Sequence, residues 1–132
     1  MNADTNDRRA RRGDSERPQA VQRAETGAEA WCEVVRAQLA AIPDHADFYA
    51  LAGEMVETLR VLDSLAGVMA RQVMSYGTGR AVYDDAGSDP AHRLRSAVLA
   101  LAEVRDGLAR AERAANQFWS AIGHVGVGAD SA

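Results

Sequence analysis

The sequence predicts an all-α protein, an up-down-up three-helix antiparallel bundle with coiled-coil-like packing. Three observations lead to this fold class. Alanine is the most frequent apolar residue, with 27 positions against 12 valines, 9 leucines and 2 isoleucines, and this composition favours helices over strands. Apolar residues recur every seven positions along most of the chain. The three prolines, Pro18, Pro43 and Pro90, lie where a helix would begin or end.

The chain of 132 residues has the length of one domain with one core. Residues 1–17 mix arginines with acidic residues and contain no large apolar residue after Met1, so we expect a disordered Arg-rich tail. The bundle is predicted over 18–123, and 124–132 form a C-terminal tail.

The first helix is predicted over about 19–41. Its start is open between two alternatives. Gly27 costs about 1 kcal/mol in a helix interior, and Thr26 with Glu29 offers a capping box for a later start than Pro18. The apolar positions seven apart are Val21, Ala28, Val35 and Ile42.

The second and third helices are predicted over about 45–76 and 90–122. Asp44 can cap the former, and Asp89 followed by Pro90 is a strong start for the latter. The second helix carries a stripe of Phe48, Met55, Leu62, Met69 and Tyr76, with Leu51, Leu59, Leu65 and Val73 on the same side. The third carries Leu94, Leu101, Leu108, Ala115 and Ile122, interleaved with Ala97, Val104, Ala111 and Phe118.

Antiparallel neighbours with moderate loops also predict which residues face each other. We expect the aromatic residues Trp31, Trp119, Phe48 and Phe118 to be the bulky members of the core. The expected pairs are Phe48 with Phe118, Leu62 with Val104, and Trp31 with Val56.

The loop 77–88 is longer than the usual connection of a helical bundle, and it lies at the end of the bundle that the first helix covers least. It is either a contact site for a partner or an internal clasp, in which Arg80 pairs with Asp84 or Asp85 and Tyr83 plugs the bundle end. The candidate partner-binding residues are Tyr76, Arg80, Tyr83, Asp84, Asp85, Met69, Val73, Leu94, Val98 and Leu101.

The sequence offers little for catalysis, and we expect no enzyme activity, cofactor or metal. Asp44, His45 and Asp47 could in principle hold a metal, but acidic residues in a first helical turn are explained by the helix dipole. Cys32 is the only cysteine, which excludes an internal disulfide, and it is interpreted as small core filler. The expected function is therefore a non-catalytic helical interaction or adaptor protein that self-associates or docks on a larger protein partner.

An alternative function is accessory nucleic-acid binding through the basic arm of Arg8, Arg9, Arg11 and Arg12. The net charge of −4 and the lack of aromatic residues in the arm weigh against it. An enzyme with an unrecognised site is a third alternative.

No apolar run is long enough for a transmembrane helix and the first residues do not form a signal peptide, so a cytoplasmic location is expected, without membrane binding.

Two segments give the chain its one resemblance to a known group. They are Gly79-Arg80-Ala81-Val82-Tyr83-Asp84-Asp85 and the ten residues from Phe118 to Val127. Together with the helical stretch around them, they resemble small uncharacterised all-helical proteins of high-GC actinobacteria. The resemblance implies an all-α fold and carries no function.

Overall fold

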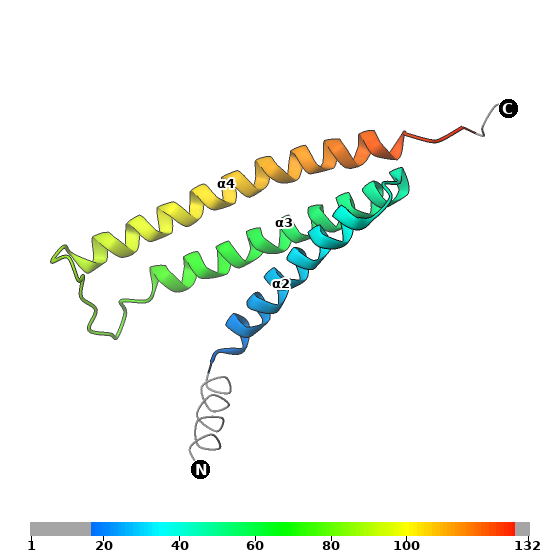
Figure 1. Cartoon of the computed structure of the whole chain (residues 1–132). Helices are drawn as coiled ribbons and strands as arrows, with labels where there is room; N and C mark the ends of the chain where they lie inside the picture. Colours follow the sequence, from blue (N-terminus) through cyan, green and yellow to red (C-terminus); the bar gives the residue numbers. More distant parts are fainter. Residues whose placement is uncertain (1–16, 129–132) are drawn as a thin grey trace, which may run out of the picture. The chain divides into compact units, whose positions relative to one another are not determined.

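The computed structural model describes residues 17–128 and confirms the all-α class (Figure 1). Its three helices are α2 (Gln19–Ala40), α3 (His45–Met74) and α4 (Pro90–Gly123). No strand occurs in the described part of the chain. The chain divides into two compact units, one ending at Pro43 and the other beginning at Asp44.

The first unit contains α2, which begins at the earlier of the two predicted starts. Pro18 is its N-cap, and Gly27 lies in its interior. The Thr26 hydroxyl donates to the backbone oxygen of Gln22, 3.1 Å away, so it does not cap a later helix. Cys32 is exposed, which corrects its interpretation as core filler. The packing of this helix on the other two, with Trp31 beside Val56, stays a prediction.

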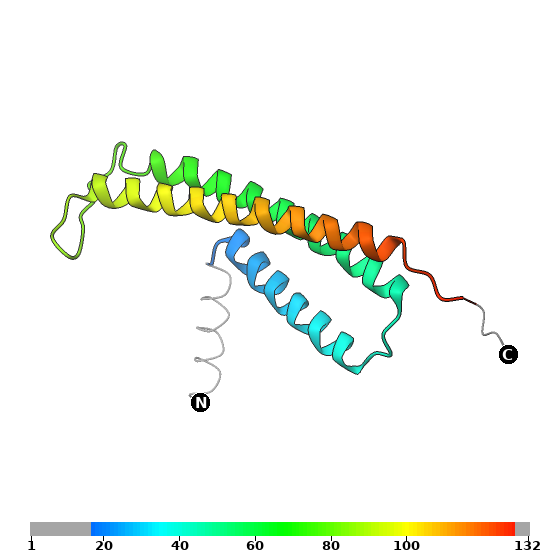
Figure 2. The ribbon, with the colours of Figure 1, turned by 90° about the horizontal axis from the view of Figure 1, so that it is seen from above.

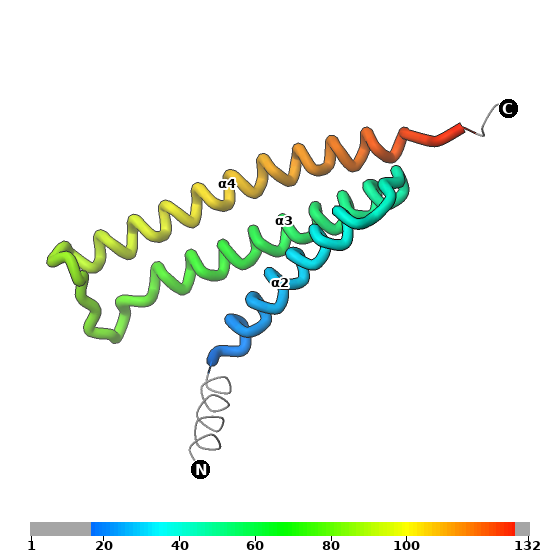
Figure 3. The backbone as a smooth tube through the Cα atoms, viewed as in Figure 1, coloured from blue at the N-terminus to red at the C-terminus, as the bar shows by residue number. Residues whose placement is uncertain are grey.

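The second unit is an antiparallel hairpin of α3 and α4, which run side by side along their length and are joined at one end by the loop 75–89 (Figures 2 and 3). Both starts are capped as predicted. The Asp44 carboxylate accepts from the Ala46 N–H at 3.2 Å, and the Asp89 carboxylate accepts from the Ala91 N–H at 3.1 Å. The acidic side chains before and within these first turns therefore have a structural role.

Small residues form the contact surface between α3 and α4. Within the described chain, the buried apolar residues are Ala52, Val56 and Ala66, and Gly67 is buried beside them. Because these side chains are short, the two helices approach closely along this line. Of the large residues in the predicted stripe of α3, Phe48, Leu59 and Val73 are half-buried, whereas Met55, Leu62, Leu65 and Met69 are exposed.

On α4, the structure corrects which row of residues faces α3. The row of Leu94, Leu101, Leu108, Ala115 and Ile122 is half-buried, as predicted. The second row of α4 that faces α3 lies four residues after the first and consists of Val98, Arg105, Glu112 and Trp119. The sequence-based prediction places this second row three residues after the first. Phe118 and Val104 are therefore exposed instead of belonging to the core.

The pairing register is also shifted from the predicted one by about one helical turn. Neither Phe48 with Phe118 nor Leu62 with Val104 forms a core pair, because both partners on α4 face away from the contact line. Trp119 instead lies against Gly53 and Tyr49, and Arg105 bonds Asp63. The shift appears at the loop end, where Gly77, three residues beyond the end of α3, already lies beside Leu94, so that the first turn of α4 extends past the end of α3.

Candidate interaction surface

One face of the hairpin is closed by polar and aromatic contacts between the helices. Arg60 Nε lies 2.7 Å from Glu112 Oε1, and Arg105 Nε lies 3.0 Å from Asp63 Oδ1. The hydrogen bond from Arg105 lowers the pKa of the Asp63 carboxyl. At the far end the ring of Tyr49 packs against Trp119 with centroids 5.6 Å apart. We call this side the closed face.

The opposite side of α3 carries large apolar residues that remain exposed. Side chains three and four positions apart share one side of a helix, so the residues at 51, 55, 58, 62, 65, 69 and 72 form one straight stripe, and Tyr76 follows just beyond the end of α3. The large exposed members are Met55, Leu62, Leu65 and Met69, which are 38% to 48% exposed. No residue of this stripe is charged.

The matching side of α4 is formed by mostly small residues. Arg105, Glu112 and Trp119 turn toward the closed face, so the row one position before each of them lies on the other side, next to the stripe of α3. This row contains Ala97, Ala100, Val104, Gly107, Ala111, Ala114 and Phe118, and it also lacks charged residues. The α3 stripe and this α4 row together form what we call the open face.

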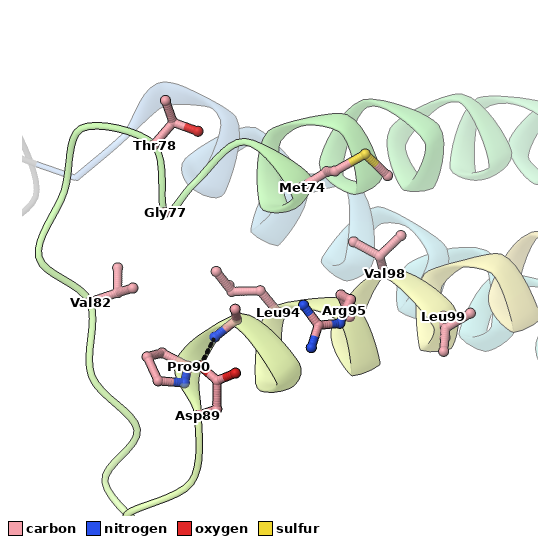
Figure 4. A pocket seen from close by; sticks show the side chains of 11 residues that line it. Met74, Gly77, Thr78, Val82, Asp89, Pro90, Leu94, Arg95, Val98 and Leu99 are labelled. Atoms are coloured by element: carbon pink, nitrogen blue, oxygen red, sulfur yellow. Dashed lines mark hydrogen bonds between the residues drawn. The ribbon is translucent and has the colours of Figure 1, made fainter.

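A pocket of about 540 Å³ lies at the loop end of the hairpin. Figure 4 shows Val98 pointing from α4 toward Met74 at the end of α3 and Leu94 pointing toward the loop at Gly77, while Val82 faces the same space from the loop. The lining is mainly apolar, with Arg95 and Asp89 at its border. The loop end of the hairpin therefore leaves apolar side chains open to this pocket.

The loop contains a clasp, but a different one from the predicted alternative. Asp84 pairs with Arg93 on α4, at 2.8 Å, and not with Arg80; its side chain is only 4% exposed. The hydrogen bond from Arg93 lowers the pKa of Asp84, and the backbone N–H groups of Ser88 and Ala86 act in the same direction. Arg80 lies over the ring of Tyr76, 4.5 Å from its centroid.

Tyr83 does not plug the end of the hairpin, since it is 86% exposed. The apolar residue of the loop that packs inward is its neighbour Val82. Asp85 is exposed. The Arg80 guanidinium donates to the backbone oxygen of Tyr76 instead of pairing with Asp85. Tyr83 and Asp85 are therefore available for contact with another molecule, and Asp84 is held within the fold.

The structure brings part of the candidate partner-binding set together. Leu94 and Val98 line the pocket, Val73 and Leu101 are half-buried nearby, and Met69 belongs to the stripe on α3. Arg8, Arg9, Arg11 and Arg12 lie outside the described residues, so the basic arm has no structural description.

Sequence reasoning misses the central part of the open face. The heptad spacing of Met55, Leu62 and Leu65 is that of a buried stripe, so it predicts these residues in the core. A signal for the correct assignment is present in Ala52 and Ala66, which are two heptads apart on the neighbouring side of α3 with Leu59 midway between them, and in Gly67 next to Ala66.

Fold and surface together define an all-α protein with an antiparallel helical hairpin, one face of which is apolar and exposed. No protein family matches the sequence, and neither a curated protein nor a solved structure is significantly similar to it. Within residues 17–128 no helix combines the length and apolar content needed to cross a lipid bilayer, and no three metal-ligating side chains gather there.

Proposed function

We propose that this protein is a non-catalytic helical interaction protein, which uses the open face of the α3–α4 hairpin to bind a protein chain, either a second copy or a larger partner. The observation that carries this proposal is the exposure of Met55, Leu62, Leu65 and Met69 in one uncharged stripe. Contiguous apolar patches of several hundred Å² are typical of interaction surfaces.

The loop end extends this surface. The apolar pocket between Met74, Val82 and Leu94 adjoins the end of the stripe, near Tyr76. Tyr and Arg side chains frequently anchor interfaces, because they bury apolar area and still form hydrogen bonds. Tyr83 is therefore proposed as a contact residue for a partner that reaches this end.

A comparison of Leu62→Glu with Leu99→Glu tests the proposal. Both residues are exposed leucines, but Leu99 lies on α4 three or four positions from no member of the open face. We expect Leu62→Glu to abolish association measured by light scattering at micromolar concentration, and Leu99→Glu to retain it. Both variants should melt at the wild-type temperature in dilute solution.

The contrary result is a large drop in the melting temperature of dilute Leu62→Glu alone. That would mean that Leu62 belongs to the internal core of one chain, as the closed three-helix bundle predicted from the sequence requires, and the proposed interaction face would be wrong.

A further inference from the structure

We infer that the partner on the open face is a second copy of this chain, and that the two hairpins form an antiparallel four-helix bundle in which the α3 stripe of each copy lies in the α4 row of the other. This inference rests on the proposed function and names its partner. Three properties of the open face support it, namely its shape, its register and its area.

The open face is complementary to itself in shape. On α3 it is a ridge of large side chains, among them Met55, Leu62 and Met69. On α4 it is a shallow trough, because four of the residues beside Val104 are Ala100, Gly107, Ala111 and Ala114. A two-fold axis places the same surface on both sides of an interface, so the ridge of each copy meets the trough of the other.

The symmetry axis that achieves this runs parallel to the helices, between the two faces. Rotation about this axis places α3 of the second copy over α4 of the first. It does not shift the second copy along the direction of the helices. The two helices are then antiparallel, as α3 and α4 are within one copy. All four neighbouring pairs have this arrangement, which is that of an up-down four-helix bundle.

The observed register then limits which residues meet. Arg105 bonds Asp63, whereas Glu112, two turns further along α4, bonds Arg60, only one turn back along α3, so the residues that are level with one another lie between these two pairings. The register that sets Leu62 of one copy against Gly107 of the other lies within that range. At this register, large members of the α3 stripe meet small residues of the other copy at three levels one heptad apart, and at two other levels both residues are large. The small partners are Ala114 for Met55, Gly107 for Leu62 and Ala100 for Met69, and the large pairs are Leu51 with Phe118 and Leu65 with Val104.

The exposed area is sufficient for a stable dimer. Six large residues of the two helices are about half exposed on this face, namely Met55, Leu62, Leu65, Met69, Val104 and Phe118. At about 100 Å² each they expose roughly 600 Å² per copy, or about 1,200 Å² for two copies, which is at the lower end of the range of stable interfaces. No charged side chain of either row would be buried, so no ion must lose its water.

A heterodimer experiment tests this arrangement with the full-length chain. Leu62→Glu places a carboxylate on the ridge, and Gly107→Arg places a guanidinium in the trough. A side chain fits at position 107 within one copy, since a Cβ there would have only the tip of Arg110 within 4 Å, at 3.9 Å. Each variant alone should be monomeric at concentrations where the wild type is dimeric.

A one-to-one mixture of Leu62→Glu with Gly107→Arg should form a heterodimer. In it the carboxylate introduced on one copy faces the guanidinium introduced on the other, and the second contact between ridge and trough is that of the wild type. Analytical ultracentrifugation with one variant carrying a mass tag measures the heterodimer. The control mixture is Leu62→Glu with Ala109→Arg, which puts the same charge at an exposed position off the open face and should stay monomeric.

Two results would overturn the inference. If the wild type dimerises but the mixture of Leu62→Glu with Gly107→Arg does not, the copies meet in another way and the proposed interaction face still stands. If the wild type is monomeric throughout the micromolar range while dilute Leu62→Glu keeps its melting temperature, the face binds a different protein. Met69→Glu with Ala100→Arg is a second pair with the same expectation, for use if a variant of the first pair fails to fold.

Discussion

At the scale of single residues, the charged side chains of the hairpin are used for internal alignment. Arg60, Asp63, Arg105 and Glu112 bond across the closed face, and Asp84 ties the loop to Arg93. Exposed ion pairs stabilise a protein only weakly, but they fix which residues face each other. They lie on the side of the hairpin opposite to the open face.

The loop clasp gives a prediction for acidic pH. The pKa of Asp84 is lowered in the folded chain, so the folded state holds fewer protons than the unfolded chain below about pH 4. The clasp therefore contributes its full stability above that pH and loses it as the pH falls through the lowered pKa. Carboxyl titration by carbon-13 NMR should place the midpoint of Asp84 below the ordinary aspartate range.

Arg93→Gln should raise that midpoint toward the ordinary value, since the hydrogen bond from Arg93 is the largest cause of the lowered pKa. Arg95→Gln is the matched control, because Arg95 lines the pocket on α4 and is not among the groups that lower the pKa of Asp84. An equal effect of both substitutions would contradict the assignment of the clasp to Arg93.

At the scale of elements, small residues decide how close α3 and α4 come. A Cβ added at Gly53 would lie 3.2 Å from a ring carbon of Trp119, which is closer than an ordinary contact. Gly107 has no such neighbour, since only the tip of Arg110 comes within 4 Å. The two glycines therefore have different roles, one in the contact between helices and the other on the open face.

Substitution of these glycines should change the free energy of unfolding in opposite directions. Gly53→Leu should destabilise the protein by about 1 to 3 kcal/mol, because the Trp119 ring must move. Gly107→Ala should stabilise it by about 0.4 to 1 kcal/mol, since alanine restricts the unfolded chain at no steric cost. Chemical denaturation of dilute protein measures both; a loss of stability in Gly107→Ala would show that position 107 is packed within one copy.

At the scale of the whole molecule, the hairpin buries few side chains completely. Val56 is 1% exposed, whereas Leu62 on the same helix is 44% exposed. A pair of helices has only one mutual contact line, so a chain with apolar residues on two sides of α3 retains a second apolar surface after the hairpin forms. We propose that association is the means by which this surface leaves water.

Thermal melting at several protein concentrations should separate the two sides of α3. Val56→Ala should lower the stability by about 2 kcal/mol at every concentration, because it leaves a cavity between α3 and α4. By mass action, the melting temperature of an associating protein rises with its concentration. Leu62→Ala should chiefly make this rise smaller. Equal losses without any dependence on concentration would favour a closed monomeric bundle.

Local sequence is enough to predict the all-α class, the three helices and most of their ends. Helix ends depend on nearby residues, and Asp44, Asp89 and Pro90 act within one turn of the chain. Local sequence does not decide where α2 begins. The free-energy cost of Gly27 in a helix interior has to be weighed against the stability that the other residues of the helix contribute.

Which apolar side of each helix faces the other depends on tertiary contacts. Small residues such as Ala52 and Ala66 and large residues such as Met55, Leu62 and Met69 both recur at multiples of seven along α3, and periodicity alone ranks the larger residues as core. The bonds of Arg105 to Asp63 and of Arg60 to Glu112, with Trp119 against Gly53, instead turn the small residues inward. These contacts join residues far apart in the sequence, so their geometry exists only once the hairpin has formed, and it is this geometry that leaves the large residues of the α3 stripe on the surface.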